Sequence, residues 1–295
     1  MECDKTINYK LAINRVIDYI NNDPEREFTL AELSKIACIS KYHFHRIFKV
    51  YTGYTLFDYI KLSRLRKSAF YLLHNPEMSL TDIAYRMGFS SSSNYARDFK
   101  KKFGYKPKDL RKKEVQLFSV DESISKLEII YPEMKKVKFD WDEKNLEIIY
   151  KDEIEIAYER LYYPYYIKDV YRVVRNFLKI LKNYGFKNSI DIGYVPNEAV
   201  IRETSYDLNI FPLLSKTDKI LENLTYMKIF GGKYALYRFW GNTFESWKAW
   251  AYFYDVWFIN SKYEIDDRPA ITVAKSPYRF IPTVKKGWEL YLPIK

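Results

Sequence analysis

The sequence contains one segment twice, and this duplication narrows what the first part of the chain can fold into. Residues 29–40, TLAELSKIACIS, align with residues 79–90, SLTDIAYRMGFS, at an offset of 50. One extra serine then raises the offset to 51, so that Arg46 aligns with Arg97. The agreement extends over a whole unit and predicts two copies of one structural element.

Each copy is predicted to form a helix, a tight turn and a second helix. The first helices begin with capping patterns at Thr29 and Ser79, each followed three residues later by an acidic residue. The second helices are predicted to begin at the capping residues Ser40 and Ser90. Between the copies, residues 55–75 have the apolar spacing of one long helix, which would act as a rigid spacer.

The second helix of each copy separates an apolar stripe from a polar face. Phe44 and Phe48 are predicted to be core in the first copy, as are Tyr95 and Phe99 in the second. Both outward faces combine an arginine with small or polar residues, which suits contact with base edges flanked by phosphates. The alternative is a solvated charged face. The candidate DNA-binding residues are Lys41, Tyr42, His45 and Arg46 in the first copy, and Ser92, Ser93, Ala96, Arg97, Lys100 and Lys101 in the second.

Positive charge is concentrated in the same part of the chain. The formal net charge is +11, of which +9 falls within residues 1–120 and +2 within the remainder. This asymmetry is typical of a protein that binds a polyanion with one of its modules. Successive major grooves lie about 34 Å apart along one side of the duplex. Two helices on a rigid spacer therefore predict binding to double-stranded DNA for which one chain is sufficient, and the oligomeric state stays open.

Composition excludes several other classes of protein. No apolar run is long enough to cross a membrane, and the opening residues lack the apolar stretch of a signal peptide. A cytoplasmic protein without a membrane partner is therefore expected. The only cysteines in the sequence are Cys3 and Cys38, and there are three histidines. This excludes a disulfide framework and argues against a zinc site, so that neither a metal nor another cofactor is expected.

The second half of the sequence is predicted to be a separate α+β domain. A weak repeat with an offset near 80 relates residues 147–161 to residues 227–241, and an amphipathic helix follows each, at about 167–184 and 243–260. Alternating apolar and polar residues on both sides of a DEKN turn predict a pair of strands within 137–150. Further strands are expected at about 190–195, 201–206, 269–275 and 287–294.

The predicted architecture is therefore α followed by α+β. An all-helical domain with two helix-turn-helix units occupies residues 1–113, a linker 114–126, and a duplicated α+β domain with an antiparallel sheet 127–295. The two repeats of the second domain would form a central cleft between them, a common place for a ligand. In the last predicted strand Glu289 and Tyr291 share one face, which places a carboxylate in an aromatic neighbourhood. The alternative is that Glu289 simply faces solvent.

The first domain resembles the DNA-binding domain of AraC-type transcription regulators, in which a long helix joins two helix-turn-helix units. The likeness covers about residues 7–112, and IAYRMGFSSSSNYARDFKKKFGYKP is close to the signature of that family. The resemblance implies base-edge contacts from Tyr42, His45 and Arg46 in the first copy. In the second copy it implies contacts from Ser92, Ser93, Ala96 and Arg97. One departure is Cys38, where the family often has a turn glycine that adopts positive φ easily.

The second domain resembles the GyrI-like effector-binding domain found in Rob-like regulators. The likeness rests on ELYLPI, which contains Glu289, and on the two-repeat layout. It implies that Glu289 lies in an aromatic pocket, where a carboxylate would bind a lipophilic cation or amphiphile through charge neutralisation and cation–π contact. The candidate ligand-binding residues are Glu289 and four aromatic walls, Tyr158, Trp240, Trp250 and Tyr291.

Together the two resemblances imply a transcription regulator whose second domain senses a small molecule. Two alternatives stay open for that domain. Some GyrI-like domains are hydrolases of electrophilic compounds, in which Glu289 would act as a general base or nucleophile. An aromatic surface could instead bind a protein partner such as RNA polymerase. No further catalytic motif supports the enzyme, so a non-enzymatic regulator is expected.

Overall fold

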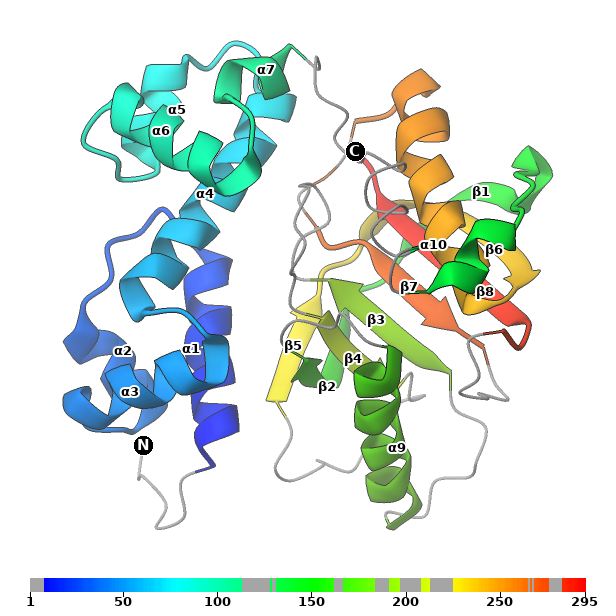
Figure 1. The fold of residues 1–295 in the computed structure, drawn as a ribbon, viewed down its shortest axis with the longest axis horizontal. Coiled ribbons are helices and arrows are strands. Elements are labelled where there is room, and N and C mark those ends of the chain that lie inside the picture. The colour runs from blue at the N-terminus through cyan, green and yellow to red at the C-terminus, as the bar shows by residue number, and fades with distance from the viewer. Residues whose placement is uncertain are drawn as a thin grey trace. The chain divides into compact units, whose positions relative to one another are not determined.

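The computed structural model describes residues 8–112, 128, 131–161, 167–183, 191–196, 208–212, 225–264, 266, 268–275 and 283–295. These residues form two compact units, one helical and one built on a sheet (Figure 1). The predicted linker at 114–126 lies outside the described residues, so the predicted domain bounds stay predictions.

The helical unit confirms the predicted duplication. Helices α2 and α3 form the first helix-turn-helix unit, α5 and α6 form the second, and the long helix α4 lies between them (Figure 1). The hydroxyl of Thr29 accepts a hydrogen bond from the backbone N–H of Glu32, and Ser79 does the same for Asp82, as the capping patterns predicted. The helices are α1 (Tyr9–Asn22), α2 (Leu30–Ala37), α3 (Lys41–Thr52), α4 (Leu56–His74), α5 (Leu80–Arg86), α6 (Ser92–Phe103) and α7 (Pro107–Arg111).

The second helix of the second copy begins one residue later than predicted. Ser91, rather than Ser90, caps α6, because its hydroxyl accepts from the backbone N–H of Asn94 at 3.1 Å. Ser90 accepts instead from the side-chain amide of Asn94 at 2.8 Å. In the first copy Ser40 takes the cap position of α3 as predicted, but its side chain makes no capping hydrogen bond.

Each copy has its own aromatic core, and α4 contributes to both. Phe48 of α3 is fully buried and meets Tyr59 of α4 edge-on, with ring centroids 5.6 Å apart. Tyr95 and Phe99 of α6 are fully buried as predicted, and the Tyr95 hydroxyl lies 3.1 Å from the hydroxyl of Ser68 in α4. Helices α3 and α6 thus contact the same long helix, α3 at Tyr59 near its start and α6 at Ser68 farther along.

The second unit contains a single sheet with strands in the order β1-β6-β8-β7-β3-β4-β2-β5. If β1 to β4 are exchanged with β5 to β8, the same order results in reverse, so the predicted duplication holds for the whole sheet. The strands are β1 (Leu146–Lys151), β2 (Ile154–Leu161), β3 (Ile192–Pro196), β4 (Leu208–Pro212), β5 (Thr225–Ile229), β6 (Gly232–Gly241), β7 (Ile271–Ala274) and β8 (Lys286–Pro293).

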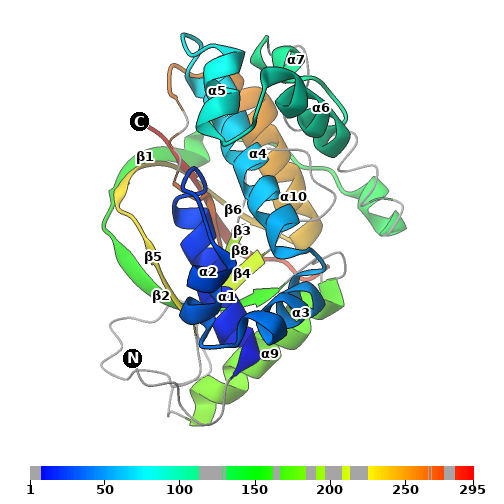
Figure 2. The same cartoon turned by 90° about the vertical axis from the view of Figure 1, so that its left-hand side faces the viewer.

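Strands of each repeat pair with strands of the other repeat. β1 pairs antiparallel with β6 of the other repeat, from Leu146 opposite Tyr237 to Lys151 opposite Gly232, and β2 neighbours β5. Residues 152–153 join β1 to β2, and residues 230–231 join β5 to β6, so these four strands form one curved two-stranded ribbon. Figure 2 shows β1, β2 and β5 at the edge of the unit. The bend of the ribbon is tight, because a Cβ added at Gly231 would lie 2.8 Å from the backbone oxygen of Lys151.

Two helices cover one side of this sheet, as predicted (Figure 1). They are α9 (Ile167–Asn183) and α10 (Thr243–Tyr252), and α10 continues through a π-helical turn, η3 (Phe253–Phe258). Helix α9 contacts β2 and β4. Helix α10 and η3 pack on β6 and β8, where Ala249 and Phe253 are buried against Leu290 and Leu292. The opposite side of the sheet has a second apolar cluster, which includes Tyr158, Phe211, Tyr234 and Tyr291.

One strand prediction differs from the structure, and another is not tested by it. No strand forms at 137–142, although the residues alternate; a 3₁₀ turn, η1 (Pro132–Lys136), precedes them and another, η2 (Glu143–Asn145), leads into β1. Trp141 instead stacks on Tyr237, with ring centroids 3.9 Å apart, and so covers the end of the helix-side core. The strand predicted at 201–206 lies outside the described residues, and the strand that follows is β4.

Candidate nucleic-acid interface and ligand-binding face

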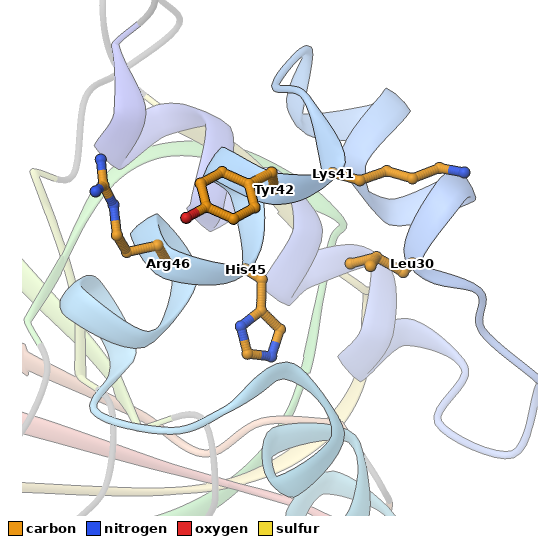
Figure 3. Close-up of a pocket in the computed structure, with 5 residues that line it drawn as sticks. All are labelled: Leu30, Lys41, Tyr42, His45 and Arg46. Carbon is orange, nitrogen blue, oxygen red and sulfur yellow. The ribbon is translucent and has the colours of Figure 1, made fainter.

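The first reading surface is the outer side of α3. Because Phe44 and Phe48 are buried inward, Lys41, Tyr42 and Arg46 point to solvent and His45 is half-buried. The side chain of Tyr42 is 81% exposed. These four residues and Leu30 of α2 line an open hollow of about 500 Å³. Figure 3 shows their side chains. In the described part of the chain no carboxylate forms an ion pair with Lys41 or Arg46, so both cations can meet phosphates or bases.

The second reading surface is the outer side of α6. Ser93, Arg97, Lys100 and Lys101 are exposed, while Ser92 and Ala96 are half-buried. The Arg97 side chain is 70% exposed and its Nε lies 3.7 Å from Asp98. Asp98 also pairs with Lys61 at 3.1 Å, which leaves Arg97 only a share of that carboxylate. All ten predicted DNA-binding residues thus lie on the outer sides of the two second helices, and their contact with DNA stays a prediction.

The turn before each second helix has the same left-handed backbone. Cys38 has φ 54° and its counterpart in the second copy, Gly88, has φ 71°. In the described residues Cys38 is the one residue other than glycine with positive φ. The departure noted in the sequence is therefore accommodated by strain at one position, and the turn itself is retained.

The side of the sheet opposite the helices carries a group of charged and aromatic side chains, which we call the Glu289 face. Glu289 is 9% exposed, and Tyr291 lies next to it on the same side of β8. The members of the Glu289 face are Glu147, Lys151, Asp191, Arg238, Trp240, Lys275, Glu289 and Tyr291.

The carboxylate of Glu289 already has three donors. The Tyr291 hydroxyl donates to Oε2 at 2.7 Å, and Lys275 Nζ lies 3.0 Å from the same oxygen. Arg238 Nε donates to Oε1 at 3.2 Å. Both cations are shared with a further carboxylate, since Arg238 pairs with Glu147 and Lys275 lies 3.1 Å from Asp191. The predicted binding carboxylate is therefore not free: it belongs to a network of ion pairs.

This network keeps Glu289 ionised. Burial alone would raise the pKa of its carboxyl, but the hydrogen bonds from Tyr291 and Lys275 and the charge of Lys275 hold the pKa below its usual range. Lys151 is the third cation of the Glu289 face, and its ammonium lies 5.2 Å from the centre of the Tyr291 ring. Burial lowers the pKa of Lys151, although the charge of Glu289 acts in the opposite direction.

The aromatic walls predicted for Glu289 divide between the two sides of the sheet. Tyr158 lies in the same apolar cluster as Tyr291 and is fully buried. Trp240 is 69% exposed and lies beside Lys275 on the Glu289 face. Trp250 was wrongly placed: it packs against the helix-side core, and its indole N–H donates to Thr272 at 2.8 Å. A helical stripe predicts that a tryptophan is buried, but not on which side of the sheet.

Sequence reasoning missed the cations around Glu289. Arg238 is two residues before Trp240 in a strand that alternates, so its face was accessible from the sequence. Lys275 and Lys151 reach the same face only through the pairing of β7 with β8 and the order of β1, β6 and β8. No local signal in the sequence specifies those neighbours.

Neither a membrane span nor a metal cluster is found among the residues that the structure describes. None of their helices is both long and apolar enough to cross a membrane. No three His, Cys, Asp or Glu side chains of the described ranges are grouped so that they could hold a metal ion.

Comparison with known proteins assigns a family to each unit. A helix-turn-helix domain family matches residues 33–113, and a family described as a GyrI-like small molecule binding domain matches residues 144–295. The chain is 32% identical over 102 residues to "Probable transcription factor PqrA" of Proteus vulgaris, a match that covers 34% of this chain and 83% of that protein. It is 31% identical over 99 residues to "Uncharacterized HTH-type transcriptional regulator YbfP" of Bacillus subtilis (strain 168), covering 34% of this chain and 33% of that one.

The chain is also similar to a solved structure over about half of its own length. The structure of SAV2435 bound to tetraphenylphosphonium is 10% identical, with a TM-score of 0.38, and the match covers 51% of this chain and 93% of that chain. The chain spans about a third of the length of the curated relatives that it matches first. The double helix-turn-helix unit and the duplicated sheet define a DNA-binding protein with a small-molecule binding domain. Through these units the chain belongs to the GyrI-like family and carries an AraC-type DNA-binding domain.

Proposed function

We propose that this protein is a cytoplasmic transcription regulator that binds double-stranded DNA with α3 and α6 and responds to a small molecule bound by the sheet unit. The observation that supports this most directly is the equivalence of the two helix-turn-helix units. Each has the same left-handed turn and presents one exposed arginine, Arg46 or Arg97. With α4 as a spacer, each reading helix enters one of two adjacent major grooves, so one chain is sufficient.

Arginines and lysines on α3 and α6 have different roles in DNA binding. Arg46 and Arg97 lie on the outer sides of helices whose neighbouring positions are small or polar, and an arginine in the major groove donates two hydrogen bonds to guanine. Lys41, Lys100 and Lys101 are exposed near the helix ends, where cations meet phosphates and fix orientation without specifying sequence.

For the ligand we propose the Glu289 face, where charged and aromatic side chains meet. The exposed Trp240 supplies aromatic surface there, beside the ion pairs of Glu289. A lipophilic cation, expected from the sequence, would have to displace Lys275 or Arg238 from the Glu289 carboxylate. Contact with RNA polymerase and a central cleft between the repeats both stay predictions.

A hydrolytic role for Glu289 receives no support from this geometry. A carboxylate that acts as a general base must be free to accept a proton, and its pKa must lie near the pH at which the enzyme works. Glu289 instead accepts from Tyr291 and lies in ion pairs with Lys275 and Arg238, and its pKa is held below the usual range chiefly by the bond from Tyr291 against the effect of burial. We therefore assign a non-enzymatic, regulatory role and no catalytic residue.

The DNA-binding proposal is tested with three alanine variants. A binding sequence is first selected from a random duplex library, and affinities are then measured by fluorescence anisotropy on the selected and on a random duplex. We expect Arg46→Ala and Arg97→Ala to lose about 1–3 kcal/mol on the selected duplex and much less on random DNA. Lys101→Ala is the matched control: it weakens both duplexes equally and lowers the salt slope by about 1.

Two results would contradict the proposal. If the selection yields no preferred DNA sequence, the protein does not bind DNA in a sequence-specific way. Equal losses on both duplexes for Arg46→Ala and Arg97→Ala would make both arginines phosphate contacts, and the base-reading role of α3 and α6 would be abandoned.

A further inference from the structure

The two helix-turn-helix copies contact each other directly, in addition to packing on α4. Residues 23–29 join α1 to α2 and run beside α4 (Figure 1). From this loop the carboxylate of Glu25 forms an ion pair with Arg86 of α5, whose Nε lies 2.7 Å from Oε2. Glu25 precedes the first copy and Arg86 belongs to the second, so the pair connects the two copies across 61 residues of the sequence.

The same carboxylate is also bound from α4. The hydroxyl of Tyr71 donates to the other oxygen of Glu25 at 2.6 Å, and the guanidinium of Arg86 lies 4.7 Å from the centre of the Tyr71 ring. Glu25, Tyr71 and Arg86 therefore each contact the other two, and we call this group the Glu25 clamp. An isolated ion pair at a surface adds little to stability, but the Glu25 side chain is only 24% exposed and accepts two hydrogen bonds.

Arg64 of α4 holds the loop in the position that presents Glu25. Its Nε donates to the backbone oxygen of Pro24 and its Nη2 to that of Arg26, both at 2.9 Å. The same guanidinium lies against Gly88, the left-handed turn residue before α6, where an added Cβ would be 2.7 Å away. The loop of the first copy and the turn of the second are thus built against one side chain.

Neither contact with DNA nor core packing explains the Glu25 clamp. An acidic side chain repels phosphates, so Glu25 gains nothing from contact with DNA. The aromatic cores of the two copies form around Phe48 and Tyr95 without it. Its effect is on geometry: a rotation of the second copy about α4 would separate Arg86 from Glu25, because one lies in α5 and the other in the loop of the first copy.

We propose that the Glu25 clamp fixes the distance and the angle between α3 and α6, and thereby makes the protein selective for one spacing of the two DNA sequences that these helices read. This rests on the proposed function, since it concerns how the two reading helices act together. One additional base pair moves the second DNA sequence by about 3.4 Å along the duplex and by about 36° around it. A clamped unit cannot follow this displacement without losing the contacts of one helix. Glu25, Tyr71 and Arg86 are in this sense positioning residues, which act through the placement of α6.

The experiment measures a spacing penalty with the full-length protein. One base pair is inserted into the selected duplex between the parts read by α3 and α6, which Arg46→Ala and Arg97→Ala identify by their relaxed preferences. The spacing penalty is the Kd on the lengthened duplex divided by the Kd on the selected duplex. We expect a penalty of about thirtyfold for the unsubstituted protein, the loss of one bidentate base contact. Glu25→Ala should reduce it about tenfold, because the second copy can then turn without breaking two hydrogen bonds to the carboxylate.

Two further substitutions control this measurement. Glu27 lies in the same loop, is exposed and acts on Arg64 by charge alone, so Glu27→Ala removes the same charge without opening the clamp and should leave the penalty unchanged. Arg86→Ala should lower the penalty as Glu25→Ala does, and the double variant should lower it no further. A loss of stability does not mimic this result, since unfolded protein weakens binding to both duplexes by the same factor.

Three results would overturn the inference. An unchanged penalty in Glu25→Ala and Arg86→Ala would mean that α4 by itself holds the two reading helices. An equal decrease in Glu27→Ala would assign the effect to charge, and equal binding of both duplexes by the unsubstituted protein would show that no spacing is selected. Each of these results is obtained on a selected DNA sequence and leaves the proposed function standing, whereas a selection without any preferred sequence contradicts both.

Discussion

Both units of this protein are built from two copies of one element, but the copies are joined differently. In the helical unit each copy keeps its own core, and α4 contributes to both. In the sheet unit β1 pairs with β6 and β3 with β7, so each copy completes the sheet of the other. The helical copies are thus able to diverge separately, whereas a change at the junction of the sheet copies affects both. The following variants test that difference.

The largest effect is expected at Gly193, in the strand where the two sheet copies meet. A Cβ at this position would lie 2.2 Å from the Phe211 ring, which is buried and has no room to move. Gly193→Ala should therefore lower the free energy of unfolding of the whole sheet unit by about 3 kcal/mol. Urea unfolding followed by tryptophan fluorescence measures this unit.

The double variant Gly193→Ala, Phe211→Leu is the control. The smaller leucine makes room for the new methyl group, so the two losses should not add. Additive losses, or an unfolding transition that splits into two steps, would show that the sheet copies are independent and would break the comparison.

A smaller and more local effect is expected at Gly88 in the second helical copy. The residue has φ 71°, and an added Cβ would lie 2.7 Å from Arg64, whose guanidinium donates to the backbone oxygens of Pro24 and Arg26. Gly88→Ala should cost about 2 kcal/mol. In this variant, hydrogen exchange should become faster in α5 and α6, relative to the unsubstituted protein, and change less in α2 and α3.

Gly104 provides the matched control for backbone strain. It has φ 85°, but nothing lies within 4 Å of an added Cβ. Gly104→Ala should therefore cost only the left-handed penalty, about 1 kcal/mol. A loss equal to that of Gly88→Ala would mean that Arg64 moves aside freely, and equal exchange in both copies would mean that they unfold together.

The helix caps give a third difference between the copies. Ser91 bonds to the backbone of Asn94, whereas Ser40 makes no capping hydrogen bond. Ser91→Ala should cost about 1 kcal/mol, and Ser40→Ala a few tenths at most. Thermal unfolding followed by far-ultraviolet circular dichroism compares the two. A larger loss for Ser40→Ala would reverse the assignment of the caps.

The smallest effect is a gain at Cys38. A glycine there avoids the strain of φ 54°, but it also makes the unfolded chain more flexible, so the two contributions partly cancel. Cys38→Gly should raise the free energy of unfolding of the helical unit by about 0.5 kcal/mol. Cys38→Ala is the control, since it keeps the strain and changes only the side chain; an equal gain from it would exclude the backbone as the cause.

The sequence predicted local features of the fold well because they depend on spacing within one element. The offsets of 50 and 51 located both helix-turn-helix units, and the aromatic stripes of α3 and α6 identified Phe44, Phe48, Tyr95 and Phe99 as core. The same reasoning wrongly predicted a strand at residues 137–142. Their alternation is real, but Trp141 stacks on Tyr237 and the segment pairs with no strand.

The ligand site was less predictable because its chemistry depends on distant neighbours. The alternation of β8 correctly joined Glu289 to Tyr291. It carried no information on Lys275 and Arg238, which reach Glu289 across two strand pairings. Trp250 was assigned from its aromatic character, although a helix covers only one side of a sheet and Glu289 lies on the other.

The exchange of strands between the sheet copies also has a consequence for the order in which the protein forms during synthesis. The pairing of Leu146 with Tyr237 joins residues far apart in the chain, and contacts of this kind form slowly. The helical unit depends on contacts close in sequence and leaves the ribosome first. Helices α3 and α6 are therefore expected to form before β6 has been synthesised, so that the helical unit folds ahead of the sheet unit.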